Sequence, residues 1–175
     1  PRIPLPPVAN HKILHEKLGW AEERFEHSSF NLYRGPENPE LIILTSGSGW
    51  MYSLESVTNL NLEDRVGILK MGTTWPLPEK FLIKHLKKTG RILFVEEVDP
   101  FLENNVKEIY AQHCFDLGLK SFSGKASEDV PSVGDLNPEI VTHAIQKLLN
   151  ISYEPRPGDY AQRVHEAASE LVPAR

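Results

Sequence analysis

The chain has 175 residues, of which 40% are hydrophobic and 25% are charged, and its formal net charge is −5. This length predicts one globular domain, and the acidic balance gives no electrostatic case for binding nucleic acid or an anionic membrane. The single cysteine excludes an internal disulfide and any metal or iron–sulfur site made only of cysteines of this chain. Since no apolar run approaches the ~20 residues that span a bilayer, we expect a cytoplasmic domain without a nucleic-acid or membrane partner.

The N-terminal part predicts a linker and a helix. Residues 1–9 are rich in proline, which suits an extended linker. A helix is expected from about residue 10 to residue 26, with one apolar stripe formed by Leu14, Leu18, Ala21 and Phe25. His11 and His15 are four residues apart, a spacing that zinc can use. Helical zinc proteases place a glutamate directly after the first histidine, where this chain has Lys12, so a solvated face is the alternative interpretation.

A short strand over residues 29–34 and a turn at 35–39 lead to the buried strand 41–45 and a helix of about residues 50–60. The glycine-rich connection before this helix is a weak candidate for an anion site, because helix N-termini favour anions; its residues are Ser46, Gly47, Ser48 and Gly49. A dinucleotide fingerprint needs a third glycine where Tyr52 stands, and a P-loop lysine is absent. A tight connection that needs small residues is the other interpretation.

The segment 65–103 predicts a βαβ unit followed by a further helix. Strands are expected at 65–70 and 91–96, because both are short apolar runs typical of a parallel sheet. Between them lies a helix with Pro78 at its first position and Gly90 at its end. The next helix opens at Asp99-Pro100, with Asp99 as its expected cap. Cys114 ends that helix, and we interpret it as a small buried or edge side chain rather than a nucleophile.

The last third predicts a strand at 118–122, a loop at 124–134, and a helix from residue 137 to about 150 capped by Asn137. Residues 151–175 predict a C-terminal linker and a short helix. The α/β domain therefore spans 10–150. Its expected architecture is three-layer α/β/α with a mostly parallel sheet of about five strands, in which 29–34 is the candidate antiparallel strand.

Polar and aromatic side chains gather where the strands of this sheet end. Glu96 and Glu97 follow one strand, and Lys70 ends its neighbour, so an ion pair with one of the glutamates is expected. Adjacent strand residues point to opposite faces, which argues against a catalytic pair of carboxylates. Trp75 stands on a proline-stiffened loop, as a lid over the core or as an anchor against another surface. Lys70, Trp75, Glu96 and Glu97 are therefore interface candidates, and no catalytic or metal-binding residue is assigned.

Two segments resemble a known family. Leu-Lys-Met-Gly-Thr-Thr-Trp-Pro-Leu-Pro-Glu (69–79) and Val-Glu-Glu-Val-Asp-Pro-Phe-Leu-Glu (95–103) are similar to the alpha subunit of indolepyruvate ferredoxin oxidoreductases. The resemblance is strongest over residues 41–106, and it implies the middle domain of that subunit, which is like the C-terminal domain of transketolase. The family uses thiamine diphosphate, Mg²⁺ and [4Fe-4S] clusters, bound by other domains. None of those binding motifs occurs here: residues 134–136 read Gly-Asp-Leu where the diphosphate motif has Gly-Asp-Gly.

The resemblance implies a non-catalytic domain that supports oxidative decarboxylation of 2-oxoacids to acyl-coenzyme A, with electrons passed to ferredoxin. Its partners would be the other domains of the alpha subunit and, through the whole enzyme, a beta subunit and ferredoxin. The isolated chain should be inactive. Two alternatives stay open: a domain that binds coenzyme A or a nucleotide at residues 46–49, and a stand-alone α/β adaptor protein.

Overall fold

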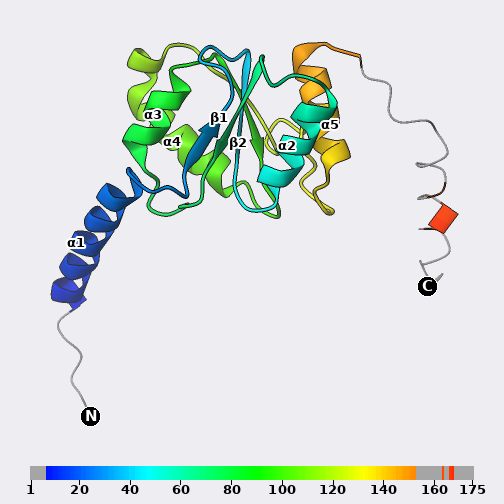
Figure 1. Ribbon diagram of the computed structural model, residues 1–175. Helices are drawn as coiled ribbons and strands as arrows, with labels where there is room; N and C mark the ends of the chain where they lie inside the picture. Colours follow the sequence, from blue (N-terminus) through cyan, green and yellow to red (C-terminus); the bar gives the residue numbers. More distant parts are fainter. Residues whose placement is uncertain (1–6, 153–162, 164–165, 168–175) are drawn as a thin grey trace.

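A computed structural model describes residues 7–152, 163 and 166–167, and its centre is a five-stranded sheet (Figure 1). The strands lie in the order β1-β3-β2-β4-β5. They are β1 (Leu32–Arg34), β2 (Leu41–Thr45), β3 (Val66–Lys70), β4 (Arg91–Val95) and β5 (Ser121–Ser123). β2 pairs in parallel with β3 and β4, β4 pairs in parallel with β5, and β1 is antiparallel to β3. The predicted α/β fold, with its antiparallel strand, is confirmed.

Helices cover both faces of the sheet (Figure 1). They are α2 (Gly49–Asn59), α3 (Glu79–Leu86), α4 (Phe101–Leu117) and α5 (Pro138–Leu149). Side chains alternate along β2, so Leu41 and Ile43 pack in the core layer beneath α2 and α5, whereas Ile42 and Leu44 pack in the layer beneath α3 and α4. All four side chains are fully buried. The unbroken apolar run of β2 is thus the sequence of a strand that is covered on both faces.

Several element boundaries differ from the expected ones. β1 has three residues rather than six, and β5 begins at Ser121 rather than at residue 118. Pro78 lies just before α3 instead of being its first residue, and α4 runs three residues beyond Cys114. Asn137 caps α5 as expected, since its side chain accepts a hydrogen bond from the N–H of Ile140 at 3.0 Å. The short helix predicted near the C-terminus lies largely outside the described residues.

The N-terminal helix α1 (Pro7–Phe25) begins three residues before the expected Asn10, so residues 7–9 of the predicted linker are helical. It extends away from the sheet, and none of its residues is buried (Figure 1). Its base is nevertheless attached: the carboxylate of Glu26 accepts hydrogen bonds from the N–H groups of Lys80 and Phe81, both at 2.8 Å. Glu26 therefore caps α3 and ties α1 to the body.

Asn31 makes a second attachment between the end of α1 and the loop after β3. Its side-chain N–H groups donate to the carbonyl of Phe25 at 3.0 Å and to Oγ1 of Thr73 at 2.7 Å. Its oxygen accepts from the N–H groups of Gly72 and Thr73. Asn31 is 6% exposed, so these bonds satisfy a buried amide. Among the described residues no helix has both the length and the apolar character needed to cross a bilayer.

His85 gives the fold a dependence on pH. It is buried between Tyr33 and Phe81, its Nδ1 lies 2.8 Å from the carbonyl oxygen of Phe81, and burial lowers its pKa from the ordinary 6.5. The unfolded chain therefore binds more protons than the folded chain between pH 6.5 and the lowered pKa. We expect the free energy of unfolding to fall as the pH falls through this window, and His85→Phe to lose that part of the pH dependence in urea titrations. An unchanged slope in the variant would contradict this assignment.

Candidate functional site

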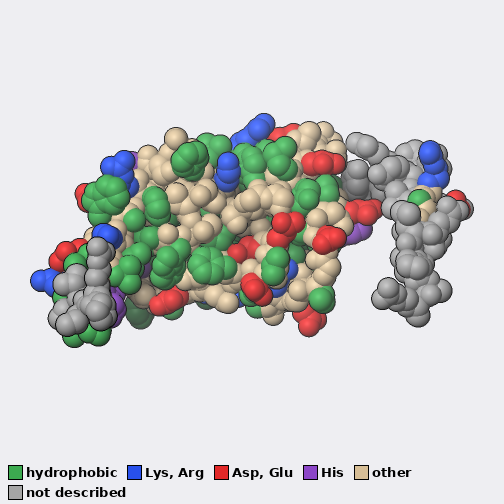
Figure 2. Space-filling model, turned by 90° about the horizontal axis from the view of Figure 1, so that it is seen from below, with side chains coloured by type: hydrophobic (Ala, Val, Ile, Leu, Met, Phe, Trp, Pro, Cys, Tyr) green, Lys and Arg blue, Asp and Glu red, His purple; other side chains and the backbone are tan. Residues whose placement is uncertain are grey.

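The candidate functional site is the carboxyl edge of the sheet, where the parallel strands end. Lys70 ends β3, Glu96 follows β4, and the segment Ser46–Gly49 follows β2. Ligands and partners of open α/β sheets gather at this edge. Figure 2 looks onto it and shows hydrophobic side chains interspersed with acidic ones.

Glu96 is a helix cap. Its Oε1 accepts a hydrogen bond from the N–H of Leu102 at 2.6 Å, and its Oε2 accepts one from the N–H of Glu103 at 2.9 Å. The residue is 5% exposed. A carboxylate in this position satisfies two free donors of α4 and interacts favourably with the helix dipole. The predicted cap, Asp99, is wrong: Asp99 is exposed, and its backbone carbonyl, not its side chain, accepts a bond from Phe101.

The expected ion pair between Lys70 and a glutamate does not form in the described part of the chain. The ammonium of Lys70 lies 5.8 Å from the ring centroid of Trp50 on α2, which suits a cation–π contact. Glu96 is occupied by the backbone of α4, and Glu97 is exposed. The physical reason is that two backbone donors fixed beside a buried carboxylate satisfy it without a long, flexible lysine side chain.

A second buried carboxylate lies beside the first. Glu103 is 1% exposed; its Oε1 lies 2.5 Å from Nζ of Lys107, and its Oε2 accepts from the N–H of Lys125 at 3.0 Å. Burial raises the pKa of Glu96, and the two backbone bonds partly oppose that shift. Every oxygen of the two carboxylates therefore has a structural partner. This arrangement joins β4, α4 and the loop after β5.

The exposed part of the edge is aromatic and apolar. Trp75 is 60% exposed, and its ring meets that of Phe101 edge to face, with centroids 6.2 Å apart. Val98 is 78% exposed and has a φ of 62°, a conformation that is unfavourable for a β-branched side chain. The exposure of Trp75 favours an anchor against another surface over a lid on the core. We call Trp75, Val98 and Phe101 the rim patch.

The connection Ser46–Gly49 has a structural explanation. A Cβ at Gly49 would lie 2.3 Å from Oγ1 of Thr45 and 2.8 Å from the carbonyl oxygen of Val95, so only glycine fits there. Oγ1 of Thr45 also donates to that carbonyl at 2.7 Å, which joins the ends of β2 and β4 beneath the start of α2. Oγ of Ser48 is buried without a hydrogen-bond partner. Tight packing thus accounts for Gly49, whereas Gly47 has open space around it and a φ of 57°, and the anion site stays a prediction.

The other chemical candidates lie away from this edge. His11 and His15 are exposed on α1 with their Nε2 atoms 2.9 Å apart, and Cys114 is a half-buried free thiol. In residues 7–152 no three side chains of histidine, cysteine, aspartate or glutamate are grouped so that they could hold a metal ion. Sequence reasoning grouped Glu103 with Glu96, Glu97 and Asp99 as the most prominent polar cluster of the chain, and the spacing of Glu103 from Lys107 was a visible signal for their contact. It did not identify Val98, since no sequence pattern marks a valine with positive φ.

The sequence of the chain is similar to that of known proteins. No protein-family model matches it. It is 32% identical to indolepyruvate oxidoreductase subunit IorA of Pyrococcus abyssi over 166 residues, and 31% identical to that of Thermococcus kodakarensis over 168 residues. The chain matches a segment of subunit IorA. Each match covers 94% of the chain but 24% of the relative, so the chain spans about a quarter of the length of these IorA subunits.

The solved structures support the fold. A split-gene transketolase, determined as an inactive β4 tetramer, superposes on the chain with a TM-score of 0.51 and 19% sequence identity. The superposition covers 70% of this chain and 42% of the transketolase chain. The IorA-like segment therefore has a transketolase-like α/β fold, as the resemblance of residues 69–79 and 95–103 implied.

The cap formed by Glu96 gives a testable expectation. Glu96→Gln keeps one acceptor oxygen but turns an amide N–H group toward the second backbone donor, so one buried N–H loses its partner. We expect the free energy of unfolding to fall by about 1–3 kcal/mol in urea titrations. The matched control is Glu97→Gln, which changes an exposed neighbour and should stay within about 0.5 kcal/mol of the original chain. Equal effects of the two substitutions would contradict the role of Glu96.

Proposed function

We propose that the chain is a non-catalytic domain of an indolepyruvate:ferredoxin oxidoreductase alpha subunit, with its rim patch docked against the domains that bind the cofactor. The observation that supports it is the similarity to IorA over 94% of the chain. The parent enzyme would decarboxylate indolepyruvate or a related 2-oxoacid oxidatively with coenzyme A and reduce ferredoxin. A beta subunit would complete it.

The cofactors of that enzyme do not fit the residues of this chain. Thiamine diphosphate and its Mg²⁺ need a Gly-Asp-Gly segment, and residues 134–136 are Gly-Asp-Leu, with a φ of 90° at Gly134. A [4Fe-4S] cluster needs several cysteines, and the chain has one. We therefore assign thiamine diphosphate, Mg²⁺ and the clusters to other parts of the parent enzyme and derive no chemical step on this chain.

The rim patch is suited to a docking role. Trp75, Val98 and Phe101 are 60%, 78% and 45% exposed, and aromatic side chains of this kind contribute strongly to interfaces when a partner covers them. Glu96 fixes the start of α4, and hence the position of Phe101, by bonds to the backbone. The patch is thus presented on a rigid support, which lowers the entropy cost of docking.

The coding sequence around this segment tests the proposal. We expect the natural reading frame to continue into a Gly-Asp-Gly…Asn thiamine-diphosphate motif and a cysteine-rich segment, because the IorA relatives are about four times as long as the match. The measurement is the sequence of the flanking DNA in the same frame. A stop codon directly after Arg175 would instead favour the stand-alone adaptor.

Ligand binding separates the proposal from its other rival. Because Gly49 is explained by its packing against Thr45 and Val95, we expect titration calorimetry of the chain with coenzyme A and with ADP to show no binding heat. The control is Gly47→Ala, which alters the exposed glycine of the connection, the one with open space around it. Saturable heat that this substitution abolishes would favour a nucleotide-like ligand at residues 46–49.

A further inference from the structure

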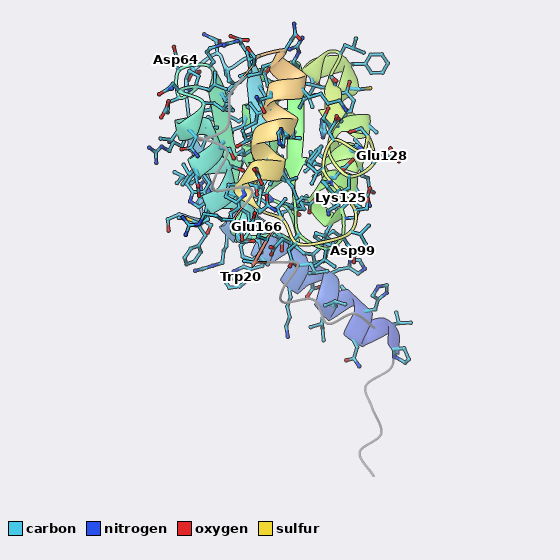
Figure 3. The ribbon with its side chains drawn as sticks, turned by 90° about the vertical axis from the view of Figure 1, so that its right-hand side faces the viewer. Trp20, Asp64, Asp99, Lys125, Glu128 and Glu166 are labelled. Carbon is cyan, nitrogen blue, oxygen red and sulfur yellow. The ribbon has the colours of Figure 1, made fainter. Side chains whose placement is uncertain are left out.

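Two histidines of α1 bring their ring nitrogens together, one helical turn apart. Residues i and i+4 of a helix lie on the same face, and the Nε2 atoms of His11 and His15 are 2.9 Å apart, with ring centroids 4.5 Å apart. Both histidines are exposed, and no residue of α1 is buried. Figures 1 and 3 show the N-terminal turns of α1 standing away from the sheet and its helices. Solvent therefore reaches the paired nitrogens directly.

The distance between these nitrogens suits two bonds to one metal ion. At the bond length of about 2.0–2.1 Å that zinc makes with histidine nitrogen, two bonds to atoms 2.9 Å apart meet at an angle of about 90°. A tetrahedral ion would need the two nitrogens about 3.3–3.4 Å apart at the same bond length. The separation in α1 thus matches neighbouring positions around a square-planar or octahedral ion.

We propose that His11 and His15 chelate one divalent transition-metal ion through their Nε2 atoms, with water at its other positions. Imidazole is a ligand for Cu²⁺, Ni²⁺ and Zn²⁺, and tetragonal nitrogen sites are typical of Cu²⁺ and Ni²⁺. The affinity of a given site also rises from Ni²⁺ to Cu²⁺ and falls again at Zn²⁺. The expected order of affinity is therefore Cu²⁺, then Ni²⁺, then Zn²⁺. Zinc, which the spacing in the sequence suggested, takes the last place.

The surroundings leave both rings available for the ion. Along α1, the residues three and four positions from either histidine carry no carboxylate, so neither ring is held in an ion pair along the helix. The contact between the two Nε2 atoms is a hydrogen bond in which one imidazole donates and the other accepts. When an ion takes the place of that hydrogen, the donor ring carries its proton on Nδ1 instead, and both Nε2 lone pairs face the ion.

Two ligands from one chain make a site of modest affinity. Among the described residues no third histidine, cysteine, aspartate or glutamate completes a group that could hold a metal ion. The two rings nevertheless act together, because after one has bound the ion the other binds it intramolecularly, at a high effective concentration. Loss of either histidine should therefore lower the affinity at least about tenfold. This inference does not depend on the proposed function, since it uses only residues of α1.

Titration calorimetry of the full chain with Cu²⁺, Ni²⁺ and Zn²⁺ tests the site. A Cys114→Ser background removes the one thiol that could also bind these ions. We expect one ion per chain in the stated order of affinity, and His15→Ala to weaken the binding at least about tenfold. The matched control is His27→Ala, which removes an exposed histidine two residues beyond the end of α1 and should leave the affinity unchanged.

Three calorimetric results would overturn the proposal. They are no binding of any of the three ions, equal affinity in His15→Ala and its background, and loss of binding in His27→Ala. Tighter binding of Zn²⁺ than of Ni²⁺ would overturn the assigned geometry. Neither substituted side chain is buried, so the circular dichroism spectra of both variants should match that of the background.

A spacing variant tests whether the two rings share the ion. His15→Ala/Glu16→His keeps the number of histidines but places the second ring about 100° further around the helix, and it should lose as much affinity as His15→Ala. Pulsed electron paramagnetic resonance of the Cu²⁺ complex should show coupling to two imidazole nitrogens in the background chain and to one in the spacing variant. Coupling to a single nitrogen in the background chain, or full affinity in the spacing variant, would contradict chelation by His11 and His15.

Discussion

The structure depends on the burial of β2 on both faces. Leu41, Ile42, Ile43 and Leu44 are fully buried, and their alternating side chains enter two separate core layers. A strand of this kind must be paired on both edges and covered on both faces, because any other arrangement would expose apolar side chains or unpaired backbone groups. β3 and β4 supply the pairing, and α2 with α5 on one face and α3 with α4 on the other supply the cover. Because both faces of the sheet are covered, polar side chains and any contact of the sheet with another molecule lie at its edges.

At the carboxyl edge of the sheet, two glutamate carboxylates cap the N-termini of helices. α3 and α4 each follow a proline, Pro78 and Pro100, that offers no side-chain cap. In both helices a glutamate from elsewhere in the chain accepts two backbone bonds at the N-terminus: Glu26 for α3 and Glu96 for α4. These two carboxylates are thus committed to structure. What remains exposed is the rim patch, whose aromatic and strained aliphatic side chains suit contact with a neighbouring surface.

Glu26 and Asn31 connect this edge to α1. They bind the end of α1 to the start of α3 and to the loop after β3, close in sequence to Trp75. The rim patch and the exposed apolar side chains of α1, Val8, Ile13, Leu14 and Trp20, therefore lie on elements held together by buried or helix-capping hydrogen bonds. The chain matches about a quarter of the length of IorA subunits. In a longer subunit, such apolar side chains would pack against neighbouring domains.

The sequence by itself determined the sheet. The apolar runs at 41–45, 65–70 and 91–96 predicted buried parallel strands, and Asn137-Pro138 predicted the start of α5, because these signals act within a few residues and depend little on distant contacts. The residues 69–79 and 95–103 also carried the likeness to IorA. Tertiary structure alone decided the partners of the polar side chains: one of Glu96 and Glu97 was expected to pair with Lys70, whereas Glu96 caps α4 and the expected cap Asp99 does not. A carboxylate binds the donors that lie within about 3 Å of it after folding. For Glu96 this depends on how the chain turns between β4 and α4, and for Glu26 the donors belong to α3, a distant part of the sequence. The exposure of Leu14, at the start of the apolar stripe of α1, was likewise decided in three dimensions, because a helical pattern shows which face is apolar but not whether anything covers it.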